Sequence, residues 1–174
     1  MPLTVTVPSG TPEGDYVVAV VASSRALSWK AVTHVLVARH ADFDTGTDDE
    51  APWLFDNHGS GSNGPKNRFA DGEAHYTWRF PLPADTTGAK LDLHINNQFV
   101  VQVSSDNATW TTVLRETEQI RDASNDAVRT LDLTPYLAAT DGTTPRTVYV
   151  KVSDAFPDDG WGGQTSHVTV TPTP

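Results

Sequence analysis

Short stretches in which apolar and polar residues alternate are the dominant feature of this sequence. In His75–Leu82 the apolar residues Tyr76, Trp78 and Phe80 occupy every second position, and Val148–Val152 repeats the pattern. A period of two is typical of a β-strand with one buried face. Apolar residues nowhere recur at the three-and-four spacing of an amphipathic helix over three turns, so long helices are not expected.

Further strand-like stretches occur between clusters of turn residues. They are Val32–Ala38, Leu91–Ile95, Phe99–Ser104, Thr111–Leu114 and Val168–Thr171, while Leu131–Leu137 has the character of a strand end running into one helical turn. Between Arg39 and Glu73 the chain is rich in Asp, Asn, Gly and Ser, and a long loop is expected there. Many short strands separated by turns predict an all-β fold, a jelly-roll β-sandwich of about eight or more antiparallel strands.

The first part of the chain differs from the rest. Leu3–Val7 and Tyr16–Ala22 flank a Pro- and Gly-rich turn and predict a β-hairpin. We therefore expect two parts: an N-terminal hairpin over 1–28, the remnant of a preceding immunoglobulin-like module, and the sandwich over 29–174.

Charge restricts the classes of partner. The chain carries 22 acidic and 12 basic residues, a formal net charge of −10. Nucleic acids and anionic membrane surfaces attract clustered Lys and Arg, so neither is expected as a partner. There are no cysteines, which excludes disulfides. Met1 is followed by Pro-Leu-Thr and the chain ends in a Thr/Pro stretch, Thr169–Pro174; we expect a piece of a longer, secreted chain, folded as a monomer beside other domains.

Motifs for catalysis and cofactor binding are weak. Gly59–Gly64 matches G-x-G-x-x-G by letter, but Pro65 follows and no helix pattern opens there, so a phosphate-binding loop is not expected. No G-x-S-x-G elbow is present. A carboxylate pair for glycoside hydrolysis depends on distances in space, which the sequence leaves open. We do not expect an enzyme.

Acidic residues suggest cation binding. Asp42, Asp44, Asp48 and Glu50 have the spacing of oxygen ligands for calcium, although Gly46 and Trp53 do not fit an EF-hand. A calcium loop and a solvated acidic loop both remain open there. The six histidines show no paired ligand spacing, so zinc is not expected.

The five tryptophans divide by context. Trp78 and Trp110 stand among apolar strand residues and are expected in the core, whereas Trp29 could go either way. Trp161 lies between two glycines, and Trp53 lies in the acidic region. An exposed indole can stack on the apolar C–H face of a sugar ring; for Trp161, a lid over the end of the sandwich is an equal alternative.

Two segments resemble a known family. Asn97–Val113, where a strand ending in Val-Ser is followed by an Asp turn and a Trp-Thr strand, resembles the central strands of galactose-binding-like (discoidin or F5/8 type C-like) β-sandwiches. Leu131–Leu137 and the following Val148–Val152 are similar to the late strands of the same jelly roll in carbohydrate-binding modules. The resemblance extends over about Val32–Thr171.

This resemblance implies a non-catalytic carbohydrate-binding module that tethers a secreted bacterial glycan-degrading enzyme to its polysaccharide. Six residues are expected to contact the sugar: Trp161, Trp53, Asp159, Arg68, Asn57 and His58. It further implies a structural Ca²⁺, for which the expected ligands are Asp154, Asp158, Asp71 and Glu73. The alternative is a structural spacer or interaction domain that binds no sugar.

Overall fold

The structure is a computed structural model that describes residues 14–23, 28–37, 40–62, 66–118, 127–138 and 145–173. The chain divides into two compact units, residues 1–39 and residues 40–174. Each unit is described separately below.

The first unit contains an antiparallel hairpin of β1 (Gly14–Ser23) and β2 (Ser28–Val37), in register from Gly14 opposite Val37 to Ser23 opposite Ser28. We expected the sandwich to begin at residue 29 with a buried strand at Val32–Ala38. The structure instead pairs this segment with β1, and Val32 is 52% exposed. The predicted strand at Leu3–Val7 lies outside the described residues, and the origin of the hairpin stays a prediction.

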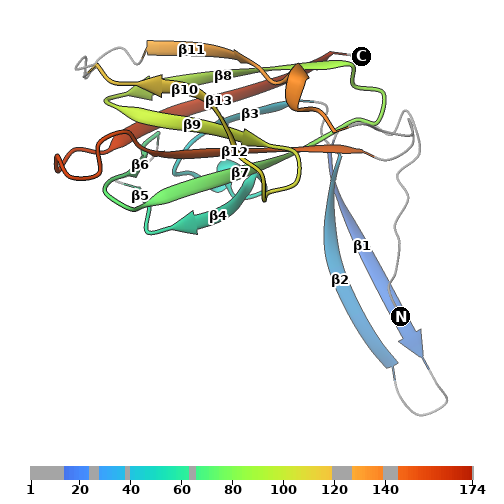
Figure 1. Cartoon of the computed structure of the whole chain (residues 1–174). Coiled ribbons are helices and arrows are strands. Elements are labelled where there is room, and N and C mark those ends of the chain that lie inside the picture. Colours follow the sequence, from blue (N-terminus) through green and yellow to red (C-terminus); the bar gives the residue numbers. More distant parts are fainter. Residues whose placement is uncertain are drawn as a thin grey trace. The chain divides into compact units, whose positions relative to one another are not determined.

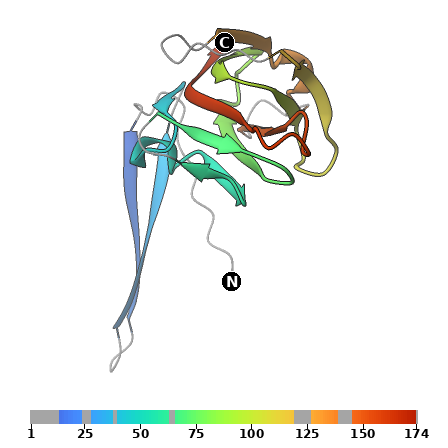
Figure 2. The same cartoon turned by 90° about the vertical axis from the view of Figure 1, so that its left-hand side faces the viewer.

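The second unit is a sandwich of two antiparallel sheets, shown in Figures 1 and 2. The first sheet, in spatial order, contains β10 (Thr111–Glu116), β9 (Phe99–Ser104), β12 (Arg146–Asp154), β7 (His75–Leu82) and β4 (Leu54–His58). The second contains β11 (Ala127–Asp132), β8 (Gly88–Asn96), β13 (Gly163–Thr173), β6 (Arg68–Ala70) and β5 (Gly61–Ser62), and β3 (Ala41–Asp44) also pairs with β13.

The predicted all-β sandwich is confirmed. The strands expected at His75–Leu82 and Phe99–Ser104 coincide with β7 and β9. Four others fall within the longer strands β8, β10, β12 and β13: Leu91–Ile95, Thr111–Leu114, Val148–Val152 and Val168–Thr171. The expected helical turn after Leu131 is the 3₁₀ turn η2 (Thr134–Tyr136). From β7 onward the chain passes repeatedly between the two sheets, so both sheets bury a face against the same core.

The prediction of a long loop over 39–73 is wrong. This region contains β3, β4, β5, β6 and the 3₁₀ turn η1 (Asp48–Glu50). The carboxylate of Glu50 organises it: Oε1 accepts from Arg68 Nε at 2.6 Å and Trp78 Nε1 at 2.8 Å, and Oε2 accepts from the Gly46 N–H at 2.7 Å. This buried, fully bonded carboxylate joins η1 to β6, β7 and the turn at Gly46.

The core is aromatic at one side. Phe43 and Trp53 stack with ring centroids 6.1 Å apart, and Trp53 packs 5.8 Å from Phe80. Trp78 is fully buried, as predicted. Trp110 was expected in the core, but it is only half-buried, and Lys151 Nζ lies 4.2 Å from its ring centroid. It immediately precedes β10, the outermost strand of the first sheet among the described residues.

Within the described part of the chain, no helix has the length and apolar character that a membrane span requires.

Candidate functional site

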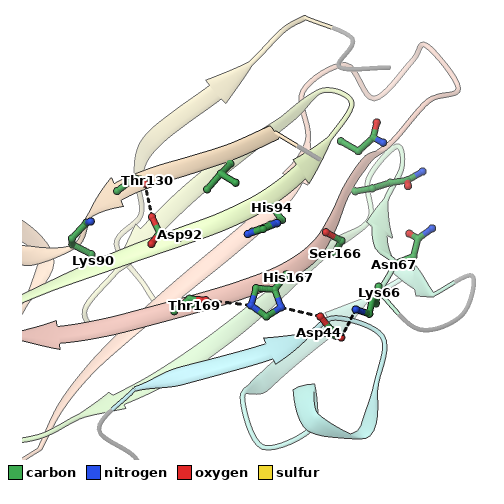
Figure 3. A pocket seen from close by; sticks show the side chains of 13 residues that line it. Asp44, Lys66, Asn67, Lys90, Asp92, His94, Thr130, Ser166, His167 and Thr169 are labelled. Atoms are coloured by element: carbon green, nitrogen blue, oxygen red, sulfur yellow. Dashed lines mark hydrogen bonds and ion pairs between the residues drawn. The ribbon is translucent and has the colours of Figure 1, made fainter. Parts of the chain in front are cut away.

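A wide groove of about 1100 Å³ lies on the outer face of the second sheet. Figure 3 shows its polar side chains rising from β8, β13, β11 and the β3 end. Alternation along β8 produces this face, because Leu91, Leu93 and Ile95 are fully buried while the residues between them point away from the core. The groove is lined by Asp44, Lys66, Asn67, Lys90, Asp92, His94, Asn96, Val128, Thr130, Gln164, Ser166, His167 and Thr169.

Strand register places these side chains in rows across the sheet. His94 lies opposite Val128 on one side and His167 on the other, and His167 lies opposite Asp44. The next row contains Thr130, Asp92, Thr169 and Asp42. A bulge between Thr165 and His167 keeps Gln164 and His167 on the same face. The sheet therefore presents polar groups from four strands side by side.

His167 is held between two carboxylates. Its Nδ1 lies 2.8 Å from Asp44 Oδ1, and its Nε2 lies 2.8 Å from Asp42 Oδ1. Both contacts are hydrogen bonds at once only when the ring carries two protons. Lys66 Nζ lies 3.1 Å from Asp44 Oδ2. The hydrogen bond with His167, followed by the contacts with Lys66, lowers the pKa of Asp44 below its usual value.

The groove carries charges of both signs. Among the lining residues, Asp44 and Asp92 oppose Lys66 and Lys90. Thr130 Oγ1 donates to Asp92 Oδ1, and the His94 and His167 rings meet edge to face with centroids 5.1 Å apart. The Asp42 carboxylate lies beside these residues, 2.8 Å from His167 Nε2.

One groove atom lacks a partner. Asn67 Oδ1 is buried and has no hydrogen-bond partner in the structure. A buried acceptor without a donor costs free energy until a donor reaches it.

Two of the predicted sugar-contacting residues are structural instead. Trp53 is 8% exposed and packs in the aromatic core, so neither face of its indole is open to a ligand. Arg68 is 7% exposed, and its guanidinium is bound to Glu50 and to Ser60 Oγ at 3.3 Å. Both residues were misassigned because the polar sequence around them suggested an exposed loop.

Asn57 and His58 are exposed on β4, in the opposite sheet from the groove. Asn57 Oδ1 accepts from Ser60 Oγ, and the His58 ring stacks on His75 at 4.8 Å. The structure therefore does not bring this pair together with the groove.

Trp161 lies in the loop 155–162 between β12 and β13 and is 59% exposed. Figure 1 shows this loop at the same end of the sandwich as the β8–β9 turn. Gly160 has φ of +73°, and a Cβ at Gly162 would lie 2.1 Å from the Ala70 carbonyl oxygen. The two glycines are thus needed for the turn and for close backbone approach. Asp159 Oδ1 accepts from the Trp161 N–H at 2.8 Å, which fixes the tip of the loop.

The predicted calcium ligands do not fit a site built from side chains. Asp154 is 6% exposed, with Oδ1 accepting from the Phe156 N–H at 2.9 Å and Oδ2 from the Gly72 N–H at 3.2 Å. Asp71, Glu73 and Asp158 are exposed. In the described ranges, no three His, Asp or Glu side chains are grouped as metal ligands. Calcium stays a prediction that these contacts do not support.

Of the groove residues, the sequence singled out Asp44, as a candidate calcium ligand, and none was expected to contact a sugar. Asp92 and His94 do alternate with Leu91, Leu93 and Ile95, which indicates that they face away from the core. The missing information is that β8 pairs with β13 and β13 with β3, since those strands are far apart in the sequence.

No protein-family model matches the sequence, and a search of curated proteins finds no match. Solved structures show distant similarity. A family GH115 4-O-methyl-α-glucuronidase with specificity for decorated arabinogalactans is 11% identical, with a TM-score of 0.45 over 70% of this chain and 17% of its own. A xylanase 10C mutant from Cellvibrio japonicus, in complex with xylopentaose, is 12% identical, with a TM-score of 0.42 over 79% of this chain and 27% of its own.

A structure described as a carbohydrate-binding module of the β-sandwich superfamily is 11% identical, with a TM-score of 0.35 over 94% of this chain and 75% of its own. This chain spans less than a third of the first two proteins. TM-scores below 0.5 establish neither a shared family nor a shared ligand, so the galactose-binding-like resemblance stays a prediction.

Proposed function

We propose that this chain is a non-catalytic carbohydrate-binding module, and that the groove on the outer face of β11, β8, β13 and β3 binds a neutral glycan. The observation that carries the proposal is the groove itself: an open polar trench lined by amides, hydroxyls and imidazoles, with two aspartates and two lysines among its lining residues. An anionic or cationic ligand would gain little from such a surface, whereas a hydroxyl can both donate and accept.

The lining chemistry suits a chain of sugars. Amides at Asn96 and Gln164, the Thr169 hydroxyl and the His94 ring offer donors and acceptors along the strand direction. These side chains rise from strands of a rigid sheet, so little conformational freedom is lost when a ligand binds. Trp161 would add a stacking surface for a sugar at the loop end, with Asp159 beside it.

The biological role that follows is tethering. As one domain of a secreted glycan-degrading enzyme, the module would hold the catalytic domain near its polysaccharide and raise its effective concentration. The alternative, a spacer that orients neighbouring domains, predicts that no glycan binds.

Calorimetry with a panel of neutral soluble polysaccharides tests the proposal. Replacement of one groove residue, in Gln164→Ala or His94→Ala, should weaken binding about five-fold, the equivalent of one net hydrogen bond. Gln102→Ala is the matched control, because Gln102 lies on the outer face of the other sheet and donates to Thr112 Oγ1 at 3.4 Å. Absence of binding across the panel, or equal affinity for all variants, would overturn the groove as the site.

A further inference from the structure

The outer face of the first sheet carries three cations that no carboxylate neutralises within the described part of the chain. They are Arg79 on β7, Lys151 on β12 and Arg115 on β10. By contrast, Lys66, Arg68 and Arg129 each have a carboxylate partner, at 3.1, 2.6 and 2.6 Å. The chain has a net charge of −10. On this face the register also places the Asp56 carboxylate in the row of Thr77 and Lys151, where it lies 3.3 Å from His75 Nε2.

Each of these three cations lies over an aromatic ring. The Arg79 guanidinium carbon is 5.6 Å from the Phe55 centroid, and the Arg115 guanidinium carbon is 5.6 Å from the Phe156 centroid. Lys151 Nζ is 4.2 Å from the Trp110 centroid. An aromatic face holds a cation in place without cancelling its charge as a carboxylate would. The positive charge therefore stays available to a ligand.

Strand register arranges the three cations along a diagonal. Arg79 lies opposite Tyr149, and Lys151 is two residues further along β12. Ser153, two residues beyond Lys151, lies opposite Val100, and Val100 lies opposite Arg115. Each step moves to a further strand and a further row in the same direction, so the Cα atoms span roughly 20 Å. That length fits an extended polymer better than a small anion.

We propose that this face, here called the cationic face (Arg79, Lys151, Arg115 and the rings beside them), binds an acidic polysaccharide, a sugar chain that bears carboxylates. Charge complementarity supplies the attraction. The Tyr149 and Ser153 hydroxyls, which point to the same face, supply partners for sugar hydroxyls.

A polysaccharide fits this face better than an acidic polypeptide does. The cations lie on β7, β12 and β10, and the backbone groups of β12 are already paired with β7 and β9. An extended peptide laid across the face would find no backbone partners for its own N–H and C=O groups. Sugar hydroxyls need only side-chain partners.

The proposal does not rest on the neutral glycan in the groove. It concerns the opposite sheet and a ligand of different charge, so either proposal can fail while the other stands. Burial lowers the pKa of Lys151, which indicates that a bound carboxylate would stabilise an ammonium that the protein leaves partly desolvated.

The test compares polygalacturonate with its fully methyl-esterified form by calorimetry at low and high salt. We expect binding of the acidic form, weaker binding at high salt, and no binding of the ester. Lys151→Gln and Arg79→Gln should each weaken binding of the acidic form about ten-fold or more. Lys30→Gln, which removes one exposed positive charge from the hairpin, is the matched control and should change affinity little.

Thermal melts of each variant show whether it is folded, and Arg79→Lys, which keeps the charge, should retain most of the binding. Three results would overturn the proposal: no binding of polygalacturonate, equal binding of its ester, or tighter binding of poly-L-glutamate of the same charge. Equal losses of affinity in Lys30→Gln and Lys151→Gln would also overturn the proposal, since they would show that binding depends on net charge alone.

Discussion

Arg68 and Glu50 form a buried ion pair, with Arg68 Nε 2.6 Å from Glu50 Oε1 and both side chains less than a tenth exposed. The pair joins β6 to η1, and Glu50 also accepts from Trp78 in the core. It explains why a polar stretch expected to be a loop is instead ordered into short strands.

Removing one partner of this pair should destabilise the fold. Arg68→Met leaves the Glu50 carboxylate buried without its cation, and we expect a loss of about 3–5 kcal/mol in the free energy of unfolding. The control is Lys66→Met, which breaks an ion pair whose lysine side chain is 67% exposed and should cost less than about 1 kcal/mol. Urea denaturation measures both; similar small losses would contradict the structural role of Arg68.

Two tryptophans give a matched comparison of core and surface. Trp53→Ala should lower the free energy of unfolding by about 3–5 kcal/mol, because it removes a buried ring from the cluster with Phe43 and Phe80. Trp161→Ala should change stability little, since this indole is 59% exposed.

Glycan affinity separates the two roles of Trp161. If its indole stacks on a sugar, Trp161→Ala weakens binding of a neutral glycan about five- to ten-fold. Unchanged affinity in calorimetry would show that Trp161 is not part of the ligand site, and the proposed site would then consist of the groove without Trp161.

The acid side of the stability curve should depend on two carboxylates. The pKa of Asp106 is lowered by hydrogen bonds from the backbone N–H groups of Thr109 and Ala108, and the pKa of Asp44 is lowered by His167. A folded-state pKa below the unfolded value means that the stabilisation is present above that unfolded value, here 3.8, and is lost as pH falls through the folded-state pKa. Urea denaturation between pH 7 and pH 2 should therefore show falling stability at the acid end.

Asp106→Asn tests this assignment, because Asn keeps a carbonyl acceptor for the turn but does not titrate. The variant should be less stable than the parent at pH 7, and the difference should shrink toward pH 2. A constant difference at every pH would show that the charge of Asp106 does not stabilise the turn.

The calcium hypothesis can be tested by measuring the melting temperature. If the chain binds structural Ca²⁺, its melting temperature should be lower in EDTA than with added Ca²⁺, because a ligand that binds only the folded state stabilises it. Mg²⁺ at the same concentration controls for ionic strength. Equal melting temperatures in all three conditions would remove calcium from the account.

Strands with clean alternation were predictable from the sequence, as β7 and β9 show, because burial of one face imposes the pattern locally. The strands β3 to β6 were not predictable, because their arrangement depends on the hydrogen bonds that Glu50 accepts from Arg68 and Trp78. Both partners are distant from Glu50 in the sequence. Trp53 was assigned to a ligand for the same reason: its sequence neighbours are polar, while its neighbours in space are Phe43 and Phe80.

The candidate site was less predictable than the fold. The outward direction of Asp92 and His94 follows from the alternation in β8, but the groove needs β13 and β3 beside them. Pairing between strands so far apart is set by the whole topology and leaves no local signal. For Trp161 the flanking glycines left an exposed indole and a lid over the sandwich end as equal alternatives, and the structure has the indole 59% exposed.

The groove can be tested most directly by recording amide ¹H–¹⁵N spectra while a neutral oligosaccharide is added. The account predicts saturable shifts concentrated in β8 from Asp92 to Asn96 and in β13 from Gln164 to Thr169, with little change in β9 and β12. Shifts confined to the first sheet or to the loop 155–162, or no shifts with any member of a broad neutral panel, would contradict the groove as a glycan-binding site.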